Sequence, residues 1–516
     1  MYCRYLKQTV VLILGSRCEG GTAMEVNYYD KKNPTSIEEY AKKIIGKSFL
    51  DIIQEADLNP ELKLEVIDKY GNPRRKGGLG NLLEEVYFGY KANSNQQADF
   101  HEAGVELKVS AYEISKKGHF RAGERLVITM ISYEKPIELH FSDSKILDKI
   151  AVILLVYYLR DRSLGSNLLY PIDFVSLFSP PAEDMEIIKN DYEKIAGKIR
   201  EGNAHQLSES DTLYLAASTK GATAVKSTVA QYYNPSIPAR KRAFSLKNSY
   251  MTYVLNEYLR KDVVTYEPIV KDIDILKEKS FEDYITERIN SYIGGTDAEL
   301  CRLFGREYNN NKYQWVDLAY RMLGIKSNKA EEFAKANIVV KAIRLEENGH
   351  MIESSSLPAI NLKEFVEEEW EESTLYSYFE QTKFLFVVFR KSGDSYTLKG
   401  AQMWNMPLED LESKVRDGWE KIREVIADGV AFTPVEIKNK KTIVRNNLPK
   451  KADNPVIHIR PHSNKSFYLF GDGTTVGNGS IKDAEELPDG RWMTRQSFWI
   501  NNTYILEQLE EGLKVK

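Results

Sequence analysis

The sequence predicts an α/β fold in which a mixed sheet is flanked by helices, and it predicts that this fold occurs twice in tandem. Two observations indicate the sheet. The apolar run at 150–158 (IAVILLVYY) suits a central buried strand. At 105–110, apolar and polar residues alternate, as is typical of a half-buried strand. Helical patterns precede and follow these strands, which favours helices packed on the sheet. The third observation is an internal repeat, described below.

The elements of the first copy are predicted in the following order. Ser36 and Glu39 form a capping box at the start of an amphipathic helix. After a glycine-rich turn, the stretch NLLEEVYFGY predicts a second helix that carries Glu84 and Glu85. The remaining elements are strands at 105–110, 126–133, 150–158 and 173–178, and a long helix at 182–200.

One face of the strand at 105–110 carries charged residues. A period of two puts Glu106 and Lys108 side by side on that face, and Asp99 precedes them across a short turn that contains Gly104. Two carboxylates and a lysine that converge at a strand suit a magnesium-dependent phosphodiesterase, because Mg²⁺ prefers hard oxygen ligands. The alternative is an ordinary solvated strand face. The rest of the chain has to decide between them.

Composition indicates a globular protein without a membrane segment. The chain has 516 residues with 28% charged and a net charge of −4, so any DNA binding has to come from local basic patches. Cys3, Cys18 and Cys301 are too few and scattered for a disulfide framework or a zinc cluster, and a reducing cytoplasm is expected. The longest apolar run falls short of the roughly 20 residues that span a bilayer. Residues 1–24 are interpreted as an extension, because Met24 could itself begin the chain.

Segments of the first half reappear in the second half in the same order. ADFHEAGVELKVS returns as EEFAKANIVVKAI, with Phe100 over Phe333 and Lys108 over Lys341. NDYEKI returns as DGWEKI, and FSLKNSYMTYVL returns as FWINNTYILEQL. Similar offsets predict two copies of one fold. The expected boundaries are a catalytic domain at 25–260, a charged linker at 261–279, and a second domain at 280–516.

The second copy has lost part of the charged pattern. Val339 stands where the first copy has Glu106, and Glu332 stands where it has Asp99. Valine cannot bind a metal, so the second copy is expected to be catalytically degenerate. A solvated face has no reason to change so sharply in a copy that keeps its apolar positions. The loss therefore favours a catalytic role for Glu106 in the first copy.

These motifs resemble a known group of nucleases. The stretch KGGLGNLLEEVYFGYKANSNQQADFHEAGVELK is similar to the MutH family of mismatch-repair endonucleases, which nick DNA at GATC. The two-copy layout, with RAFSLKNSY and QSFWINN, resembles the Sau-type restriction endonucleases, which cut before the G of GATC. The resemblance runs from about residue 36 to 510 and implies two restriction-endonuclease-like copies of the PD-(D/E)xK fold. Ala98 takes the place of the usual proline.

The resemblance implies roles for particular residues. It puts metal-binding carboxylates at Asp99 and Glu106, a further helical carboxylate at Glu84, and the catalytic lysine at Lys108. A second lysine falls on Lys149, although Lys145 competes for that position. The expected cofactor is Mg²⁺. For Glu84, the alternative is a solvent-facing helix residue, because helices commonly expose glutamate.

The implied function is that of a type II restriction endonuclease. It would hydrolyse both strands of double-stranded DNA at GATC, before the G, and leave 5′-phosphate ends. Two chains would meet on one site as a homodimer, and a cognate DNA methyltransferase would be the genetic partner. One alternative is a GATC-nicking repair endonuclease, but repair members resemble a single copy. The other is a non-cleaving DNA-binding regulator, which the intact acidic and basic pattern argues against.

Basic residues of both copies are candidates for holding DNA, because affinity requires lysine and arginine facing phosphates. STKGA (218–222) and RKRAFSLK (240–247) are the candidates for reading bases, and HIRPHS (458–463) is the related segment of the second copy, which is expected to bind DNA and to regulate. Solvated loops are the alternative for each segment. The expected DNA-binding residues are Lys76, Lys116, Arg121, Arg125, Lys220, Arg240, Arg242, Lys247, Arg460 and His462.

Overall fold

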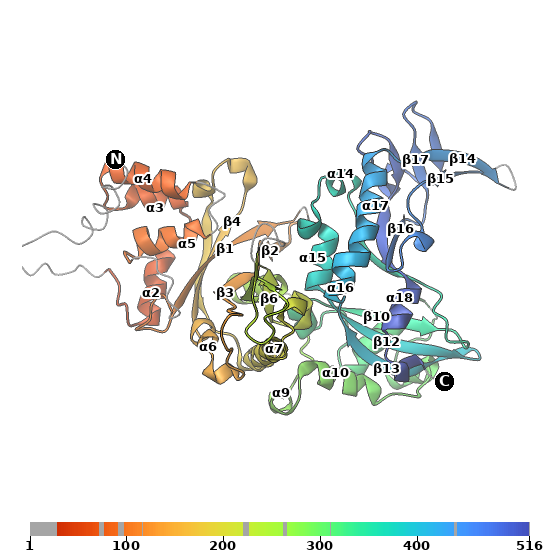
Figure 1. Ribbon diagram of the computed structural model, residues 1–516, viewed down its shortest axis with the longest axis horizontal. Coiled ribbons are helices and arrows are strands. Elements are labelled where there is room, and N and C mark those ends of the chain that lie inside the picture. Colours follow the sequence, from red (N-terminus) through yellow and green to blue (C-terminus); the bar gives the residue numbers. More distant parts are fainter. Residues whose placement is uncertain are drawn as a thin grey trace, which may run out of the picture.

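The computed structural model describes residues 28–71, 77–90, 98–115, 117–219, 227–261, 266–309, 311–437 and 441–514. Its N-terminal half, up to residue 261, is built around a mixed four-stranded sheet of order β2-β1-β4-β5 (Figure 1). In this sheet β1 (Glu106–Ile114) is parallel to β4 (Ile153–Leu159). The outer strands β2 (Phe120–Ala122) and β5 (Ile172–Phe178) pair antiparallel with β1 and β4.

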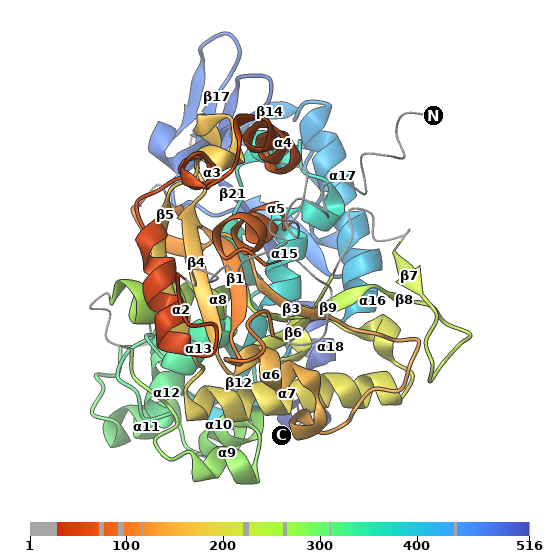
Figure 2. The same cartoon turned by 90° about the vertical axis from the view of Figure 1, so that its left-hand side faces the viewer.

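The predicted central strand is confirmed as β4, whose first five residues are all buried. One face of the β1-β4-β5 sheet is covered by the N-terminal helices, and in Figure 2 β1 and β4 lie side by side next to them. The predicted long helix is also confirmed, as α7 (Ala182–Arg200). The other helices of this half are α2 (Pro34–Ala41), α3 (Phe49–Glu55), α4 (Pro60–Tyr70), α5 (Gly78–Leu82), α6 (Lys145–Ile150) and α8 (Asn248–Tyr253).

The N-terminal half also contains a second sheet, which is antiparallel and has the order β3-β9-β6. It consists of β3 (Leu126–Met130), β9 (Arg242–Leu246) and β6 (Leu215–Thr219). The short pair β7 (Thr228–Val229) and β8 (Ala239–Arg240) stands beside it.

The C-terminal half repeats both strand arrangements. β10 (Ile338–Leu345) is parallel to β12 (Lys383–Ser392), which is antiparallel to β13 (Ser395–Trp404), as β1, β4 and β5 are. A second antiparallel sheet has the order β11-β21-β16, as β3-β9-β6 does. Its strands are β11 (Ser355–Ala359), β21 (Gln496–Ile500) and β16 (Ile457–Pro461).

The remaining elements of the C-terminal half are helices and two peripheral sheets. The peripheral sheets lie at the upper right of Figure 1. The helices are α9 (Asp274–Glu278), α10 (Phe281–Asn290), α11 (Asp297–Leu303), α12 (Gln314–Met322), α13 (Glu331–Ala336), α14 (Leu362–Phe365), α15 (Thr374–Gln381), α16 (Leu408–Asp410), α17 (Arg416–Ala427), α18 (Asn502–Gln508) and α19 (Glu511–Lys514). The peripheral strands are β14 (Phe432–Ile437), β15 (Lys441–Asn446), β17 (Phe467–Leu469), β18 (Thr475–Gly477), β19 (Ala484–Glu486) and β20 (Trp492–Thr494).

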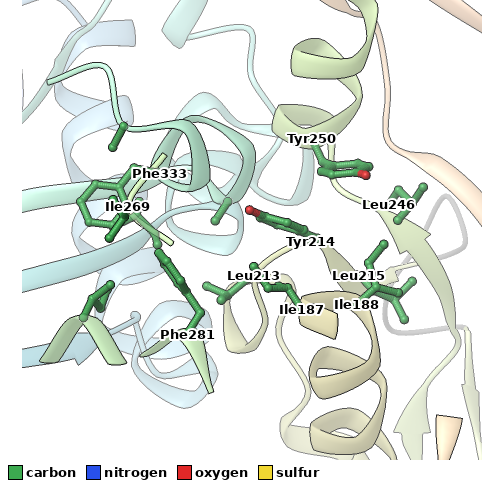
Figure 3. Packing of buried hydrophobic residues seen from close by; sticks show 14 of the residues in the cluster. Ile187, Ile188, Leu213, Tyr214, Leu215, Leu246, Tyr250, Ile269, Phe281 and Phe333 are labelled. Atoms are coloured by element: carbon green, nitrogen blue, oxygen red, sulfur yellow. The ribbon is translucent and has the colours of Figure 1, made fainter. Parts of the chain in front are cut away.

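The two halves share one hydrophobic core. A single cluster of buried side chains runs from β2 and β3 of the N-terminal half to β12 and β13 of the C-terminal half. Figure 3 shows its middle, where Ile187, Leu213 and Tyr214 of the N-terminal half lie opposite Phe281 and Phe333 of the C-terminal half. Burial of large apolar side chains is the main stabilising term in folding, so the halves stabilise each other.

A buried ion pair crosses the same junction. Lys335 Nζ of α13 lies 2.7 Å from Asp184 Oδ1 of α7. A second ion pair across the junction is partly exposed and joins Lys194 of α7 to Glu282 of α10 at 2.8 Å. Removing Lys335 would leave Asp184 as an uncompensated buried charge, so this pair helps to fix how the halves meet. The described part of the expected linker, 266–279, belongs to this junction, because Ile269, Val270 and Leu276 are buried in the shared core.

The first helix begins one turn earlier than the capping box predicts. The side chain of Asn33 accepts hydrogen bonds from the backbone N–H groups of Thr35 and Ser36, and Pro34 occupies the first helical position. Proline favours this position because its missing N–H would have no partner there. In the described ranges, no helix has both the length and the apolar character needed to cross a membrane.

Candidate active site

Glu106 is the centre of a buried charge cluster. Its side chain, at the first position of β1, is only 2% exposed. Lys108 Nζ lies 2.7 Å from Glu106 Oε1, and Lys149 Nζ lies 3.0 and 3.1 Å from the two carboxylate oxygens. Lys149 comes from α6, so the structure brings it to the site that the resemblance implied. Lys145, the competing candidate, precedes it by one turn of the same helix.

A tight turn places Asp99 beside this pair. Phe100 and Val105 form an isolated antiparallel bridge, and Gly104 between them has φ of 66°. Glycine adopts this left-handed backbone conformation without the steric cost that a side chain would impose. The turn lets Asp99 Oδ2 accept a hydrogen bond from the backbone N–H of Leu107 at 2.9 Å. Asp99 is therefore anchored to the strand that carries Glu106 and Lys108.

Glu84 reaches the same cluster from a π-helical turn. The helix α5 widens into π geometry over Leu83–Tyr87, and such single π turns are frequent at functional sites. Glu85, its neighbour, turns the other way and binds Lys69 and Tyr70 at 2.6 Å each. Glu84 is close enough to Asp99, Lys108 and Glu106 for their charges to act on its carboxyl group.

The carboxylates of the cluster disfavour one another's charged form. Burial, followed by the Asp99 carboxylate, raises the pKa of Glu84 to about 7, while Lys108 opposes the shift. Burial, followed by Glu106, likewise raises the pKa of Asp99. Lys108, the Leu107 N–H and Lys149 act against that shift. A bound cation would favour the charged form of both groups.

The donor set fits a hard divalent cation. Asp99, Glu106 and Glu84 offer carboxylate oxygens, and Mg²⁺ is usually held by one or two carboxylates together with waters and substrate phosphates. In the part of the chain that the structure describes, no group of three or more His, Cys, Asp or Glu side chains is placed so that it could hold a metal ion by itself. Asp99 and Glu106 would therefore hold a cation together with waters and a substrate phosphate.

A cleft of about 800 Å³ leads to Lys108. Its walls include the glycine-rich turn at 77–80, the strand segment at 107–110, and residues at 123–127. Tyr158 and Tyr170 also line it, with their rings stacked 5.6 Å apart, and Arg160 lies beside them. Sequence reasoning missed these three residues, because the pattern at 150–158 indicated only a buried strand. The C-terminal half closes one side with Glu371, Glu372 and Tyr376.

Two of the predicted DNA-binding residues line this cleft with acidic partners. Arg125 pairs with Glu209 and donates to the Thr219 carbonyl at 3.0 Å. Arg240 pairs with Glu412 of the C-terminal half. Arg121 is 61% exposed at its side chain and lies 3.1 Å from Glu113. These arginines are near a path for DNA, but each already has a carboxylate within reach.

Two other predicted DNA-binding residues point into the protein, which corrects the expectation of an exposed basic run at 240–247. Arg242 is 1% exposed, donates to the Ala217 carbonyl at 2.7 Å and pairs with Glu380 at 3.3 Å. Lys247 is buried and donates to the Thr212 carbonyl. Burial, followed by the nearby Lys383, lowers the pKa of Lys247 to about 8. In this conformation neither side chain can contact a phosphate, because the C-terminal half and β6 cover them.

The remaining predicted residues lie elsewhere. Arg460 is exposed on β16, with its guanidinium 3.9 Å from the ring centre of Trp499. His462 Nδ1 lies 3.2 Å from Ser497 Oγ on the same surface. Lys76, Lys116 and Lys220 lie outside the described residues.

Comparisons with known proteins agree with this geometry. The family model described as "DNA mismatch repair enzyme MutH" matches residues 88–191, which include Asp99, Glu106, Lys108 and Lys149. The MutH mismatch repair proteins of Vibrio vulnificus and Vibrio campbellii are each 27% identical, over 42% and 44% of this chain and 89% and 94% of their own lengths. The N-terminal half therefore contains a MutH-like domain.

A longer match defines the family. The type II restriction enzyme Sau3AI of Staphylococcus aureus is 33% identical over 502 residues, which cover 93% of this chain and 98% of that enzyme. The chain belongs to the family of this restriction enzyme, and it is a site-specific deoxyribonuclease of the type II restriction class.

Proposed function

We propose that the protein hydrolyses both strands of double-stranded DNA at GATC, before the G, with Mg²⁺ as its cofactor and 5′-phosphate ends as its products. The observation that carries this proposal is the buried Glu106 with Lys108 and Lys149 paired to it, Asp99 anchored on the same strand, and a cleft lined by Lys108. The resemblance of the sequence motifs to GATC-cutting nucleases and the match to a type II restriction enzyme support it. A nicking repair enzyme is less favoured, because the MutH relatives match less than half of this chain.

Each residue of the cluster has a proposed role. Asp99 and Glu106 bind the cation, and Glu84 completes its surroundings or holds one of its waters. Mg²⁺, when bound, would lower the pKa of a coordinated water and neutralise charge on the phosphate oxygens. Lys108 orients the attacking water or stabilises the hydroxide. Lys149 holds the Glu106 carboxylate from the opposite element, which keeps the ligand in place before DNA arrives.

The chain is proposed to consist of two tandem copies of one fold. The proposed domains are a MutH-like catalytic domain at 25–260 and a non-catalytic domain at 280–516, joined at 261–279. The identical strand orders β3-β9-β6 and β11-β21-β16 support this, as does the shared arrangement of β1-β4-β5 and β10-β12-β13. The sequence repeats fall on corresponding elements of the two halves: on β1 and β10, on α7 and α17, and on β9 with α8 and β21 with α18.

The C-terminal copy is proposed to bind a second GATC and to activate the first copy. Exposed Arg460 on β16, His462 just after that strand, and the neighbouring Trp499 offer a basic and aromatic surface. Because each chain has one competent metal site and a palindrome needs two cuts, two chains would act together on one site. A cognate DNA methyltransferase encoded nearby would protect the host, and finding one would favour restriction over repair.

The central test is a plasmid digest. Supercoiled DNA with one GATC is expected to become linear in Mg²⁺ and to stay intact in EDTA, and DNA with the site changed by one base should stay intact. Mapping of the ends should place the cut before the G. Glu106→Gln serves as the matched inactive control. A purified, folded protein that leaves GATC plasmids intact in Mg²⁺ contradicts the proposal.

The regulatory part has a separate test. Plasmids with two GATC sites should be cut faster than plasmids with one, and a short GATC duplex added in trans should restore the slower rate. Equal rates on both plasmids, with no effect of the duplex, would leave the C-terminal half with a structural role only.

A further inference from the structure

Tyr90 has an unusual position next to the candidate metal site. It follows the π-helical turn that carries Glu84, and its backbone N–H donates to the Glu84 carbonyl at 3.0 Å. Its ring packs edge-on against Phe100, the neighbour of Asp99, with ring centres 5.2 Å apart, and it also contacts Phe88, whose ring packs on Phe100. The side chain is therefore fixed between the segments that supply two of the three carboxylates.

The hydroxyl of Tyr90 is not needed for this packing. It is buried, and among the described residues it has no hydrogen-bond partner. A buried hydroxyl without a partner is unfavourable, and a phenylalanine would fill the same aromatic cluster without that cost. Native proteins rarely keep such a group without reason, so the hydroxyl calls for a partner that the described residues do not supply in this conformation.

The charges around the hydroxyl indicate what that partner is. Burial and the nearby carboxylates of Asp99, Glu84 and Glu106 all raise the pKa of Tyr90. The hydroxyl is thus a neutral donor in the neighbourhood of carboxylates that can accept a hydrogen bond. Asp99 has one oxygen engaged by the Leu107 N–H, which leaves further lone pairs, and no hydrogen bond to the Glu84 carboxylate is found among the described residues.

We propose that Tyr90 is a positioning residue of the metal site, whose hydroxyl donates a hydrogen bond to the Glu84–Asp99 carboxylate pair when a divalent cation is bound. The inference rests on the proposed function, because it requires that these carboxylates bind a cation. A cation draws its carboxylate ligands together, and a donor on their outer side fixes their orientation. Tyr90 would act on the reaction only through these two ligands.

The test compares three tyrosine-to-phenylalanine variants. Tyr90→Phe removes only the hydroxyl in question. Tyr29→Phe is a control from the same aromatic cluster, since the Tyr29 hydroxyl donates to the Phe88 carbonyl at 3.1 Å. Tyr157→Phe is a control with another buried hydroxyl that has no partner among the described residues, located within β4. Melting temperature in EDTA, Mg²⁺ affinity by calorimetry, and the Mg²⁺ dependence of cleavage are measured for each.

Tyr90→Phe is expected to melt in EDTA at or above the wild-type temperature and to bind Mg²⁺ roughly tenfold more weakly, as for a lost hydrogen bond to a charged group. Half-maximal cleavage should need correspondingly more Mg²⁺. Both control variants should keep the wild-type Mg²⁺ affinity, with Tyr29→Phe melting earlier.

Two outcomes would overturn the inference, and they can be told apart. If wild type and Tyr90→Phe bind Mg²⁺ equally well and need the same concentration for cleavage, Tyr90 only packs and the proposed function stands. If the wild-type protein binds no Mg²⁺, the proposed function falls together with this inference.

Discussion

The charge cluster around Glu106 in the N-terminal half and the position aligned with it in the C-terminal half contain similar residues. The hydrogen-bond partners of these residues differ. In the N-terminal half, Asp99 is held by one backbone N–H and faces other carboxylates. In the C-terminal half, Glu332 accepts hydrogen bonds from the backbone N–H groups of Ile269 and Val270, at 2.9 to 3.1 Å. The Asp99 carboxylate keeps lone pairs that are available to a ligand. The Glu332 carboxylate is already satisfied by hydrogen bonds from the chain itself.

The lysines differ in the same way. Lys108 lies against the Glu106 carboxylate, whereas Lys341 donates to the Ser356 carbonyl at 2.9 Å, because Val339 offers it no carboxylate. Burial lowers the pKa of Lys341. A similar sequence pattern therefore has different contacts in the two halves: the lysine pairs with a carboxylate in the N-terminal half and with a backbone carbonyl in the C-terminal half.

The largest expected effect is on catalysis in the N-terminal half. Glu106→Gln should lower the cleavage rate by at least about a thousandfold, because it removes a ligand of the cation and breaks the pairing with two lysines. DNA binding should change little. Single-turnover cleavage of a one-site duplex measures the rate, and Val339→Glu in the other half is the matched control with unchanged cleavage. A Glu106→Gln protein that retains several per cent of the wild-type rate would remove this residue from the site.

Mg²⁺ is expected to stabilise the protein by binding at the charge cluster around Glu106 and not at the aligned position of the C-terminal half. At a Mg²⁺ concentration a hundredfold above its dissociation constant, the free energy of unfolding should rise by about 2.7 kcal/mol in the wild-type protein. Removal by EDTA should reverse the effect, which is measured as a shift in thermal melting. Glu106→Gln should lose most of the shift, whereas Lys341→Met should keep it. A full shift in the Glu106 variant would mean that the cation binds elsewhere.

Two isosteric substitutions distinguish a carboxylate that stabilises the fold from a carboxylate that is proposed to bind the cation. In EDTA, Glu332→Gln should lower the free energy of unfolding by about 1–2 kcal/mol, because a charge-assisted pair of backbone hydrogen bonds is weakened. Asp99→Asn should leave that stability unchanged or slightly higher, because it removes one of several mutually repelling charges. Urea unfolding of both variants makes the comparison. The reverse ranking would contradict the distinction between the two halves.

The smallest effect concerns basic residues within the N-terminal half. Lys241 is exposed on the wall of the cleft, so Lys241→Ala should weaken DNA binding at low salt. The slope of the logarithm of the binding constant against the logarithm of the salt concentration should become less steep by about one. Lys247→Met, its buried counterpart, should instead lower stability and leave that slope unchanged. DNA binding titrations in Ca²⁺ at several salt concentrations measure both slopes. A changed slope in the Lys247 variant would show that this side chain becomes exposed on DNA.

Local pattern was enough to predict β4, α7 and the strand that carries Glu106 and Lys108, because each depends on the periodicity of its own segment. The position of Glu84 depended on a π-helical turn, which no propensity or period indicates. Arg242 and Lys247 were expected at the surface, since nothing near them in sequence reveals that the C-terminal half covers them. Such tertiary burial is beyond the reach of a pattern read along the chain.

Because one hydrophobic core extends through both halves, the N-terminal half cannot be separated from the C-terminal half without exposing apolar side chains. A gene shortened after residue 261 would encode a protein whose Leu213 and Tyr214 lose their apolar cover and whose Asp184 loses Lys335. Exposed apolar surface of this kind promotes aggregation, so the shortened product is expected to aggregate although it keeps every residue of the charge cluster. An engineer who wants the nuclease as a portable module therefore has to redesign this face before excising the domain.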